Sequence, residues 1–346
     1  RGVPLTFRDW SKNEKAKAEM MAKPGKNNLI TDVAGISVGQ AEDARVRTGT
    51  TVILAEKPAV AAVCVAGGGP GTRETDLLAG GTLVDVVDAI CLSGGSAFGL
   101  AAADGVAAGL KKAGRGFGLI DLPTVPKSPI VPAAILYDLA NGGDKDWGEA
   151  SPYAALGRTA YDTASGAFRL GRAGAGYGAA AGAHLGGTGS ASIVTRDKIT
   201  VGALAAVNCY GSVYMPGTDA FWAWPYEIDG EFGGARPPSD FSMNAEDWGA
   251  AKLNPSLGQN TTIACIATDA ILTPDQAKRV AQMALSGFSR AIRPVFAPFD
   301  GDAVFVLATG KRALPDPTPA TVARIGELAA STLARAIARG VYMSGR

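Results

Sequence analysis

The chain has 346 residues, of which 47% are hydrophobic and 19% charged, as expected for a folded protein with one large or two ordinary domains. Its 33 basic and 32 acidic residues nearly cancel, so the chain lacks the general positive field that would hold nucleic acid. No apolar run reaches the ~18–20 residues of a membrane span. We therefore expect a protein that binds neither nucleic acid nor membrane.

The first part of the chain predicts strands joined by turns. Residues 1–28 are rich in lysine and indicate an exposed arm or an irregular helix. Ala-rich residues from Ser96 to about Lys112 predict a helix, with Ser96 as its N-cap. The expected strands before that helix lie within residues 29–39, 51–54, 59–65 and 89–93.

The middle of the chain contains an apolar run at residues 129–141, which carries Tyr137, and a predicted helix at residues 152–163. Residues 172–182 are glycine-rich but match neither phosphate-binding motif, since no Gly-Lys-Ser/Thr follows and the spacing is not GxGxxG. Residues 190–194 and 199–213 predict a pair of strands in a hairpin.

Residues 216–260 show no clear periodicity and predict a long irregular loop, which in a compact domain is usually functional or disordered. Its aromatic residues Trp222, Trp224 and Tyr226 are candidates for a wall at the entrance of a site. Core packing or a subunit interface explains such aromatic residues equally well.

The last part of the chain predicts a buried strand at residues 261–268, because this stretch is β-branched and almost uncharged. A helix is expected from Pro274 to about Arg290, with Thr273 as its cap. After it we expect a strand at residues 303–309 and a final helix at residues 319–339.

The cysteine and histidine content excludes several kinds of site. The four cysteines stand in apolar surroundings without a CxxC pair, which indicates buried thiols and not disulfides or metal ligands. His184 is the single histidine, so a His-rich zinc site cannot be built. The nearest match to a GxSxG nucleophile elbow has Phe98 in place of glycine. A hydrolase built on this chain therefore needs a base other than imidazole, and no metal or organic cofactor is expected.

Thr261 opens the predicted strand at residues 261–268. A cut between Asn260 and Thr261 would give Thr261 both a nucleophilic hydroxyl and a free α-amine. Such an amine has a pKa of about 7.7–8.0 and acts as a general base at neutral pH. The alternative is that Asn260 merely ends a loop and Thr261 merely opens a core strand. These residues alone leave both readings open.

A set of motifs in chain order carries more information than any one of them. They are Asn28–Gly39, Gly68–Leu78, Leu92–Leu100, Gly171–Gly176, Asn208–Gly211, Asn260–Ile263 and Asp300–Asp302. Together they resemble the DmpA-like aminopeptidases, a family that includes β-peptidyl aminopeptidases and nylon-oligomer hydrolases. The resemblance covers about residues 28–310, which is most of the chain.

The resemblance implies self-cleavage before Thr261, which then serves as the nucleophile. Asn208 maps onto the family's oxyanion-stabilising asparagine, and Tyr137 maps onto a tyrosine near the nucleophile. Asp300 and Asp302 map onto a polar pair, and side chains at i and i+2 of an extended segment point the same way. Both carboxylates are then expected to hydrogen-bond the Thr261 amine and hydroxyl. Read alone, the same Asp-Gly-Asp indicates a turn before a strand.

The resemblance also implies an α/β fold, namely a four-layer αββα sandwich with the layering of N-terminal-nucleophile hydrolases. The alternation of strands and helices in the sequence fits two sheets covered by helices. We expect one folded domain that is cut into an α chain and a β chain, and a homo-oligomer, since the family forms tetramers. The expected pieces are residues 1–260 (arm 1–28, core 29–215, irregular loop 216–260) and residues 261–346.

The predicted function is that of a self-processing threonine hydrolase, which cleaves short peptides or aminoacyl amides at the amino end. One alternative is a hydrolase of 6-aminohexanoate oligomers or β-peptides. Nylon-oligomer hydrolases carry a lysine after their glycine-rich stretch, where this chain has Ala183 and His184, and this difference disfavours nylon oligomers. Transfer of the acyl group to an amine, or an uncut, non-catalytic binding protein, are further alternatives.

The sequence leaves the compartment open. The chain begins at Arg1 and not at Met, which indicates a processed or truncated product. We expect a cytoplasmic protein, or a periplasmic or secreted one if a signal peptide was removed before Arg1.

Overall fold

A computed structural model describes residues 22–120, 122–252, 260–316 and 318–345 of the chain. The strands are β1 (Ile36–Asp43), β2 (Thr48–Val65), β3 (Thr72–Arg73), β4 (Val86–Ser93), β5 (Ala133–Ile135), β6 (Ala180–Ala181), β7 (His184–Leu185), β8 (Gly187–Val194), β9 (Thr200–Asn208), β10 (Thr261–Ala270) and β11 (Ala303–Arg312). The α-helices are α3 (Ala102–Lys112), α4 (Tyr153–Asp162), α5 (Pro274–Ser289) and α6 (Thr318–Ser344).

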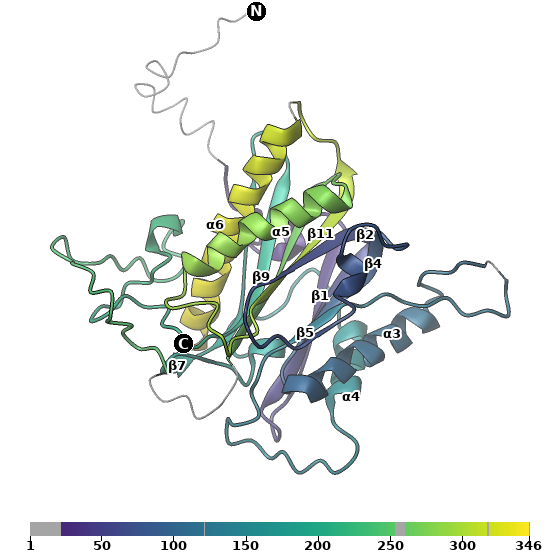
Figure 1. The fold of residues 1–346 in the computed structure, drawn as a ribbon, viewed down its shortest axis with the longest axis horizontal. Helices are drawn as coiled ribbons and strands as arrows, with labels where there is room; N and C mark the ends of the chain where they lie inside the picture. Colours follow the sequence, from purple (N-terminus) through teal and green to yellow (C-terminus); the bar gives the residue numbers. More distant parts are fainter. Residues whose placement is uncertain (1–21, 121, 253–259, 317, 346) are drawn as a thin grey trace, which may run out of the picture.

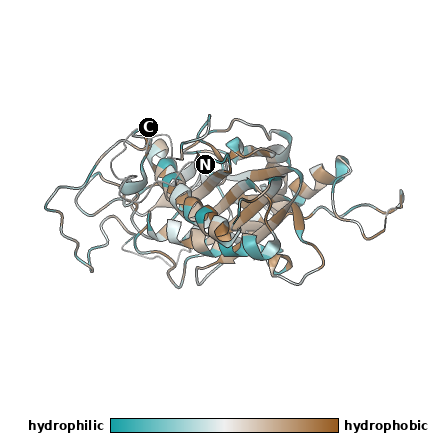
Figure 2. Cartoon of the chain, turned by 90° about the horizontal axis from the view of Figure 1, so that it is seen from above, coloured by the Kyte–Doolittle hydropathy of each residue, from teal (hydrophilic) through white to brown (hydrophobic). Residues whose placement is uncertain are grey.

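The helices cover both faces of a strand-rich centre. In Figure 1, α5 and α6 lie on one side of the strands, and α3 and α4 lie on the other. Figure 2 shows hydrophobic strands in the interior and helices whose hydrophilic residues face outward. The hydrogen-bonded order of the main sheet is β3-β5-β4-β2-β11-β10-β9-β8, with β1 paired to β2, and β6 and β7 form a separate two-stranded sheet.

Three hydrophobic cores separate four layers. One core lies between α5, α6 and the strands β8 to β11, and another lies between α3, α4 and the strands β1, β2 and β4. The third core lies between the two strand layers, where Ile53 of β2 packs with Ile263 of β10. This arrangement is the predicted αββα sandwich, because each layer buries an apolar face against the next.

The strand β2 belongs to both strand layers. The sequence predicted two strands here, at residues 51–54 and 59–65, but the chain does not turn back between them. Pairing with β4 shifts register between Leu54 and Ala59, and Glu56, Lys57 and Pro58 are exposed at this shift. Proline is tolerated there because the ladder is already interrupted. The polar segment that looked like a turn is therefore an irregularity within one long strand.

The predicted N-cap at Ser96 is wrong. Ser96 is the first residue of a 3-10 helix, Ser96–Ala101, and α3 begins only at Ala102. Gly95 precedes it with φ +91°, and its amide donates to Asp138 Oδ1 at 2.8 Å. The turn before the helix is thus stabilised by a carboxylate that is distant in sequence, and not by the predicted N-cap residue Ser96.

The helix cap at Thr273 is confirmed. Its Oγ1 accepts the amide of Gln276 at 3.3 Å, and Gln276 Oε1 accepts the amide of Thr273 at 3.0 Å. Pro274 occupies the first helical position, where no amide proton is needed. The hairpin of β8 and β9 and the helix α4 are also confirmed.

The predicted exposed arm lies partly outside the described residues, which begin at residue 22. From there on the arm has contacts with the rest of the chain: the backbones of Lys23 and Val194 exchange hydrogen bonds, and Asn28 Oδ1 accepts from Arg335 Nη2 at 2.9 Å. The free edge of β8 thus pairs with the end of this segment, while Lys23 and Asn27 remain exposed, as predicted for an arm.

The segment at residues 216–252 is irregular, as predicted. Its described part contains one short 3-10 helix, Trp224–Tyr226. A buried ion pair anchors it: Arg335 of α6 donates to Glu231 Oε2 at 3.0 Å. All four cysteines are free thiols, and Cys64 alone among them is half-buried and not fully buried.

Candidate active site

Three adjacent strands bring the predicted site residues together. Thr261 begins β10 and is paired with Asn208 at the end of the antiparallel strand β9. On the other side, a parallel bridge joins Asn260 to Asp300, just before β11. Residues that are far apart in the sequence therefore meet at one end of the sheet.

The Thr261 hydroxyl lies against the peptide bond that would be cut. In the continuous chain, Oγ1 donates a hydrogen bond to the carbonyl oxygen of Asn260 at 2.6 Å. The Gly301 amide reaches both groups, with 2.9 Å to the Asn260 carbonyl oxygen and 3.1 Å to Thr261 Oγ1. A backbone amide at this carbonyl oxygen is placed to stabilise negative charge that develops there.

Glycine is required at position 301 by the close approach of Thr261. A Cβ at this position would lie 2.7 Å from Thr261 Oγ1 and 3.0 Å from the carbonyl oxygen of Gly69. The sequence analysis did not assign Gly301 a role. Its only signal was its place between two aspartates, which is equally typical of a turn.

Asp300 and Asp302 are both buried beside Thr261, but they accept backbone amides. Asp302 Oδ1 accepts the amide of Thr262 at 2.6 Å, and its Oδ2 accepts from Phe296 at 3.2 Å. Asp300 Oδ2 accepts the amide of Ala297 at 3.0 Å, while its Oδ1 has no partner among the described residues. In the described part of this continuous chain, neither carboxylate makes the expected hydrogen bond to the Thr261 hydroxyl. The uncut chain has no free amine to draw the carboxylates in.

Burial changes the acidity of this pair. It raises the pKa of Asp300 to about 6, although the Ala297 amide and the positive charge of Lys252 oppose the shift. It also raises the pKa of Asp302 to about 7, and repulsion from Asp300 adds to the effect. Adjacent buried carboxyl groups tend to share a proton, so the pair is suited to exchange protons near neutral pH.

Asn208 and Tyr137 are linked to each other. Asn208 Nδ2 donates to the carbonyl oxygen of Tyr137 at 2.9 Å, and Asn208 Oδ1 accepts the amide of Ala180 at 3.0 Å. Tyr137 thus joins the site through its backbone, which fixes the orientation of the Asn208 amide. An amide nitrogen has two hydrogens, so the second one remains for another acceptor.

Lys252 is a site residue that the sequence analysis missed. Its Nζ donates to Asn260 Oδ1 at 2.6 Å, and its backbone amide donates to the carbonyl oxygen of Tyr210 at 2.9 Å. The sequence predicted that a cation is missing near Ala183. This position lies beside the segment that carries Lys252, because the Ala183 amide donates to the carbonyl oxygen of Ala250 at 2.7 Å. A lysine within an irregular loop carries no periodicity that would have revealed it.

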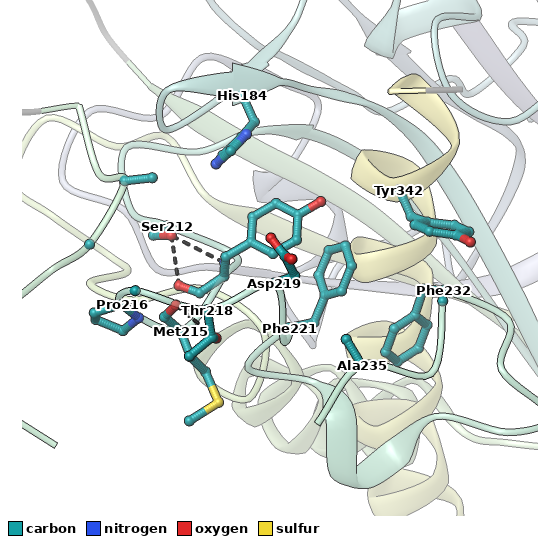
Figure 3. Close-up of a pocket in the computed structure, with 15 residues that line it drawn as sticks. His184, Ser212, Met215, Pro216, Thr218, Asp219, Phe221, Phe232, Ala235 and Tyr342 are labelled. Atoms are coloured by element: carbon teal, nitrogen blue, oxygen red, sulfur yellow. Dashed lines mark hydrogen bonds between the residues drawn. The ribbon is translucent and has the colours of Figure 1, made fainter. Parts of the chain in front are cut away.

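A cavity of about 720 Å³ is lined mostly by residues of the irregular segment, together with His184 of β7 and Tyr342 of α6. Figure 3 shows the side chains of His184, Phe221, Phe232 and Tyr342 around it. Ser212 and Ala250 also line it. Two residues away from them along the chain, Tyr210 and Lys252 are joined by a backbone hydrogen bond. The cavity and the site therefore share these two chain segments.

The aromatic residues that were predicted to wall an entrance do not line this cavity. Each of them instead stacks against an arginine: Trp222 on Arg293, Trp224 on Arg236 and Tyr226 on Arg290. Their neighbours Tyr214 and Phe221 form the wall, with ring centroids 4.3 Å apart. These contacts favour the alternative in which the three aromatic residues pack against the rest of the protein.

Two further searches bear on the site. Within residues 22–120, 122–252, 260–316 and 318–345, no group of three or more His, Cys, Asp and Glu is placed to hold a metal ion. No helix in the described part of the chain is long and apolar enough to cross a membrane.

Comparisons with known sequences identify relatives over nearly the whole chain. An uncharacterized aminopeptidase of Mycobacterium bovis is 42% identical over 336 residues, which cover 91% of this chain and 93% of that protein. A 6-aminohexanoate-oligomer endohydrolase of a Kocuria species is 31% identical over 300 residues, covering 84% of this chain and 78% of that enzyme.

Solved structures show the same fold. A β-aminopeptidase of a Burkholderia species superposes with a TM-score of 0.67 at 25% identity, over 92% of this chain and 88% of that one. The L-aminopeptidase D-Ala-esterase/amidase of Ochrobactrum anthropi, described as a variant of the Ntn-hydrolase fold, gives 0.62 at 19% identity over 94% and 89%. The family model for peptidase family S58 matches residues 28–346, so the resemblance is confirmed and this chain belongs to peptidase family S58.

Proposed function

We propose that the protein is a self-processing threonine hydrolase that cuts its own chain between Asn260 and Thr261. It then cleaves amide bonds of short peptides or aminoacyl amides at the amino end. The observation that carries this proposal is the Thr261 hydroxyl, 2.6 Å from the carbonyl oxygen of the bond it would attack. The relatives named as aminopeptidases support the substrate class.

Self-cleavage follows from this geometry as an acyl shift from nitrogen to oxygen. Thr261 Oγ1 attacks the Asn260 carbonyl carbon, and the charge that develops on the carbonyl oxygen is stabilised by the Gly301 amide. In the proposed step, a carboxylate of the Asp300–Asp302 pair moves into contact with Oγ1, takes the hydroxyl proton and passes it to the leaving nitrogen. Water then hydrolyses the ester, which leaves a carboxylate on Asn260 and a free α-amine on Thr261.

The same groups perform the later reaction. The Thr261 amine takes the hydroxyl proton as Oγ1 attacks the substrate, and it later protonates the leaving amine. Asp300 and Asp302 balance the positive charge of the protonated amine. Asp300 Oδ1, which has no hydrogen-bond partner among the described residues, accepts a hydrogen bond from it. The second hydrogen of Asn208 Nδ2 and the Gly301 amide stabilise the oxyanion.

Burial explains why processing has to come first. Only 2% of Thr261 is exposed in the continuous chain, and Asn260 covers its hydroxyl. A substrate carbonyl cannot approach Oγ1 until residue 260 is cut and displaced. Processing is therefore the step that creates both the base and the access.

A second candidate substrate class is the 6-aminohexanoate oligomers, with β-peptides as a related choice. The relative from Kocuria supports it, and Lys252 provides a cation at the site, which removes the sequence argument against it. The two classes differ in the distance between the amine and the carbonyl carbon, so direct comparison separates them.

Two measurements test the proposal. Denaturing mass spectrometry of the purified protein should show fragments that end at Asn260 and begin at Thr261, whereas Thr261→Ala should remain one chain and Thr261→Ser should still be cut. The processed protein is then assayed on L-, D- and β-aminoacyl p-nitroanilides and on a 6-aminohexanoate trimer, and we expect the highest kcat/KM on an aminoacyl amide. One uncut chain without activity would instead indicate a non-catalytic binding protein.

A further inference from the structure

Lys252 has a position that the reaction steps above do not use. Its ammonium group is half-buried and lies 2.6 Å from the side-chain oxygen of Asn260. Its backbone is fixed by the hydrogen bond to Tyr210, two residues after the end of β9. The cation also attracts the Asp300 carboxylate and so opposes the rise that burial causes in the pKa of Asp300. The ammonium group is therefore held at the residue whose carbonyl group Thr261 attacks.

The precursor is the first substrate of its own nucleophile. In self-cleavage, Thr261 Oγ1 attacks the Asn260 carbonyl while the Gly301 amide holds the carbonyl oxygen. In later turnovers the same hydroxyl and the same amide act on the carbonyl of the substrate's acyl residue. That residue must therefore occupy the place that Asn260 vacates, and groups around the Asn260 side chain will surround the side chain of the substrate.

We propose that Lys252 forms the acyl-side subsite and selects acyl residues whose side chain carries a hydrogen-bond acceptor, such as asparagine or aspartate. This inference rests on the proposed function, since it requires that Thr261 be the nucleophile. Lys252 is then a specificity residue, and Asn260 is the first side chain that it binds.

The chemistry of a half-buried ammonium group supports this selectivity. A charged donor gains a strong hydrogen bond from an amide or carboxylate oxygen, whereas an apolar side chain displaces water and leaves the donor unsatisfied. Sites built to hydrogen-bond a polar group discriminate strongly against analogues that lack it, for the same reason. Burial lowers the pKa of Lys252, because its positive charge is poorly solvated at this position, so an acceptor beside the ammonium group is favourable.

The test compares selectivity and not activity alone. The ratio of kcat/KM for an asparaginyl p-nitroanilide to that for the leucyl analogue is measured in the processed wild type, in Lys252→Met and in Lys252→Arg. We expect the ratio to fall about 10-fold or more in Lys252→Met, which keeps the length of the chain but removes the donor, and to be largely kept in Lys252→Arg. The aspartyl analogue separates charge pairing from hydrogen bonding to a neutral amide.

Lys278→Met is the matched control. Its Nζ is also half-buried and donates to a backbone oxygen, that of Val63, at 2.6 Å, but on α5. This variant should keep the wild-type ratio. An unchanged ratio in Lys252→Met would overturn the subsite, and so would a fall of the same size in Lys278→Met.

Self-cleavage provides a second readout if Lys252→Met folds but is not cut. Asn260→Leu should then slow cutting in the wild type, and Asn260→Asp should be cut faster than Asn260→Leu, because the acceptor is kept. If Asn260→Leu is cut at the wild-type rate, the subsite is overturned even though Thr261 remains the nucleophile. If the wild type itself is not cut before Thr261, the proposed function fails, and that result is distinct from both.

Discussion

The amide of Gly301 donates to the hydroxyl oxygen of Thr261 at 3.1 Å, and the same amide lies 2.9 Å from the carbonyl oxygen of Asn260. One backbone group thus contacts both the proposed nucleophile and the carbonyl group that it would attack. The loop between Asp300 and Asp302 therefore does more than present two carboxylates, because its central amide would set the geometry of the proposed reaction.

Gly301→Ala should impair self-cleavage. The added Cβ would lie 2.7 Å from Thr261 Oγ1, so either the hydroxyl or the amide has to move out of line. Loss of a single oxyanion donor typically costs about 10²–10³ in rate, which sets the expected slowing. Gly166→Ala is the matched control, because nothing lies within 4 Å of a Cβ there. Both are followed by timed denaturing gels, and normal cutting in Gly301→Ala would remove the amide from the mechanism.

Asp302→Asn and Asp300→Asn should each lower turnover while the protein still folds. Proton transfer by a positioned group contributes typically about 10²–10⁴-fold, so we expect losses in this range for kcat. In Asp300→Asn the new amide oxygen still accepts the Ala297 amide, whereas in Asp302→Asn one of the two amides that Asp302 accepts, Thr262 or Phe296, loses its acceptor. Circular dichroism checks the fold, and p-nitroanilide hydrolysis checks the rate. Wild-type turnover in both variants would reduce the pair to a turn.

The free energy of unfolding of the uncut precursor should fall as the pH rises from about 4 to about 7, because Asp302 loses its proton over this interval. The pKa of Asp302 is about 7 in the folded state, against an ordinary value of about 3.9. A raised carboxyl pKa means that the folded state holds more protons in this interval. The free energy of unfolding contributed by Asp302 is thus fully present below pH ~4 and is lost by pH ~7.

This pH dependence is measured by urea unfolding of Thr261→Ala, which lacks the new amine, at several values of pH. Adding Asp302→Asn should flatten the profile and leave the protein relatively more stable at high pH. Asp240→Asn, at an exposed position, should leave the profile unchanged. A profile that is equally steep with and without Asp302 contradicts the prediction.

Arg335→Ala should destabilise the protein strongly. Only 2% of Arg335 is exposed, and it binds Glu231 of the irregular loop and the carbonyl oxygen of Ser192 on β8. Removing one partner of a buried pair typically costs about 3–5 kcal/mol, and Glu231 would keep the longer ion pair with Arg339, at 3.6 Å. Arg158→Ala, which breaks the exposed pair with Asp162, should have a much smaller effect on the free energy of unfolding. Urea unfolding compares the two, and equal effects would show that the Arg335 pair does not anchor the loop.

The sequence by itself determined the features that depend on neighbouring residues. Thr273, Pro274 and Gln276 specify the start of α5, because a cap is formed within one turn of the chain. The β-branched run after Thr261 specified a buried strand, since short apolar runs of this kind fit the interior of a sheet. The motifs in chain order specified the family.

Only the tertiary structure decided what distant segments supply to one another. Asp138 replaces Ser96 as the group that satisfies the turn before α3, and β2 stays one strand because both of its halves find partners. Lys252 reaches Asn260 from an irregular loop, and the Gly301 amide reaches Thr261 across adjacent strands. Hydrogen bonds between residues far apart in sequence produce no periodic pattern in the sequence. The donors at the site could therefore be identified only from the tertiary structure, in which the strands lie side by side.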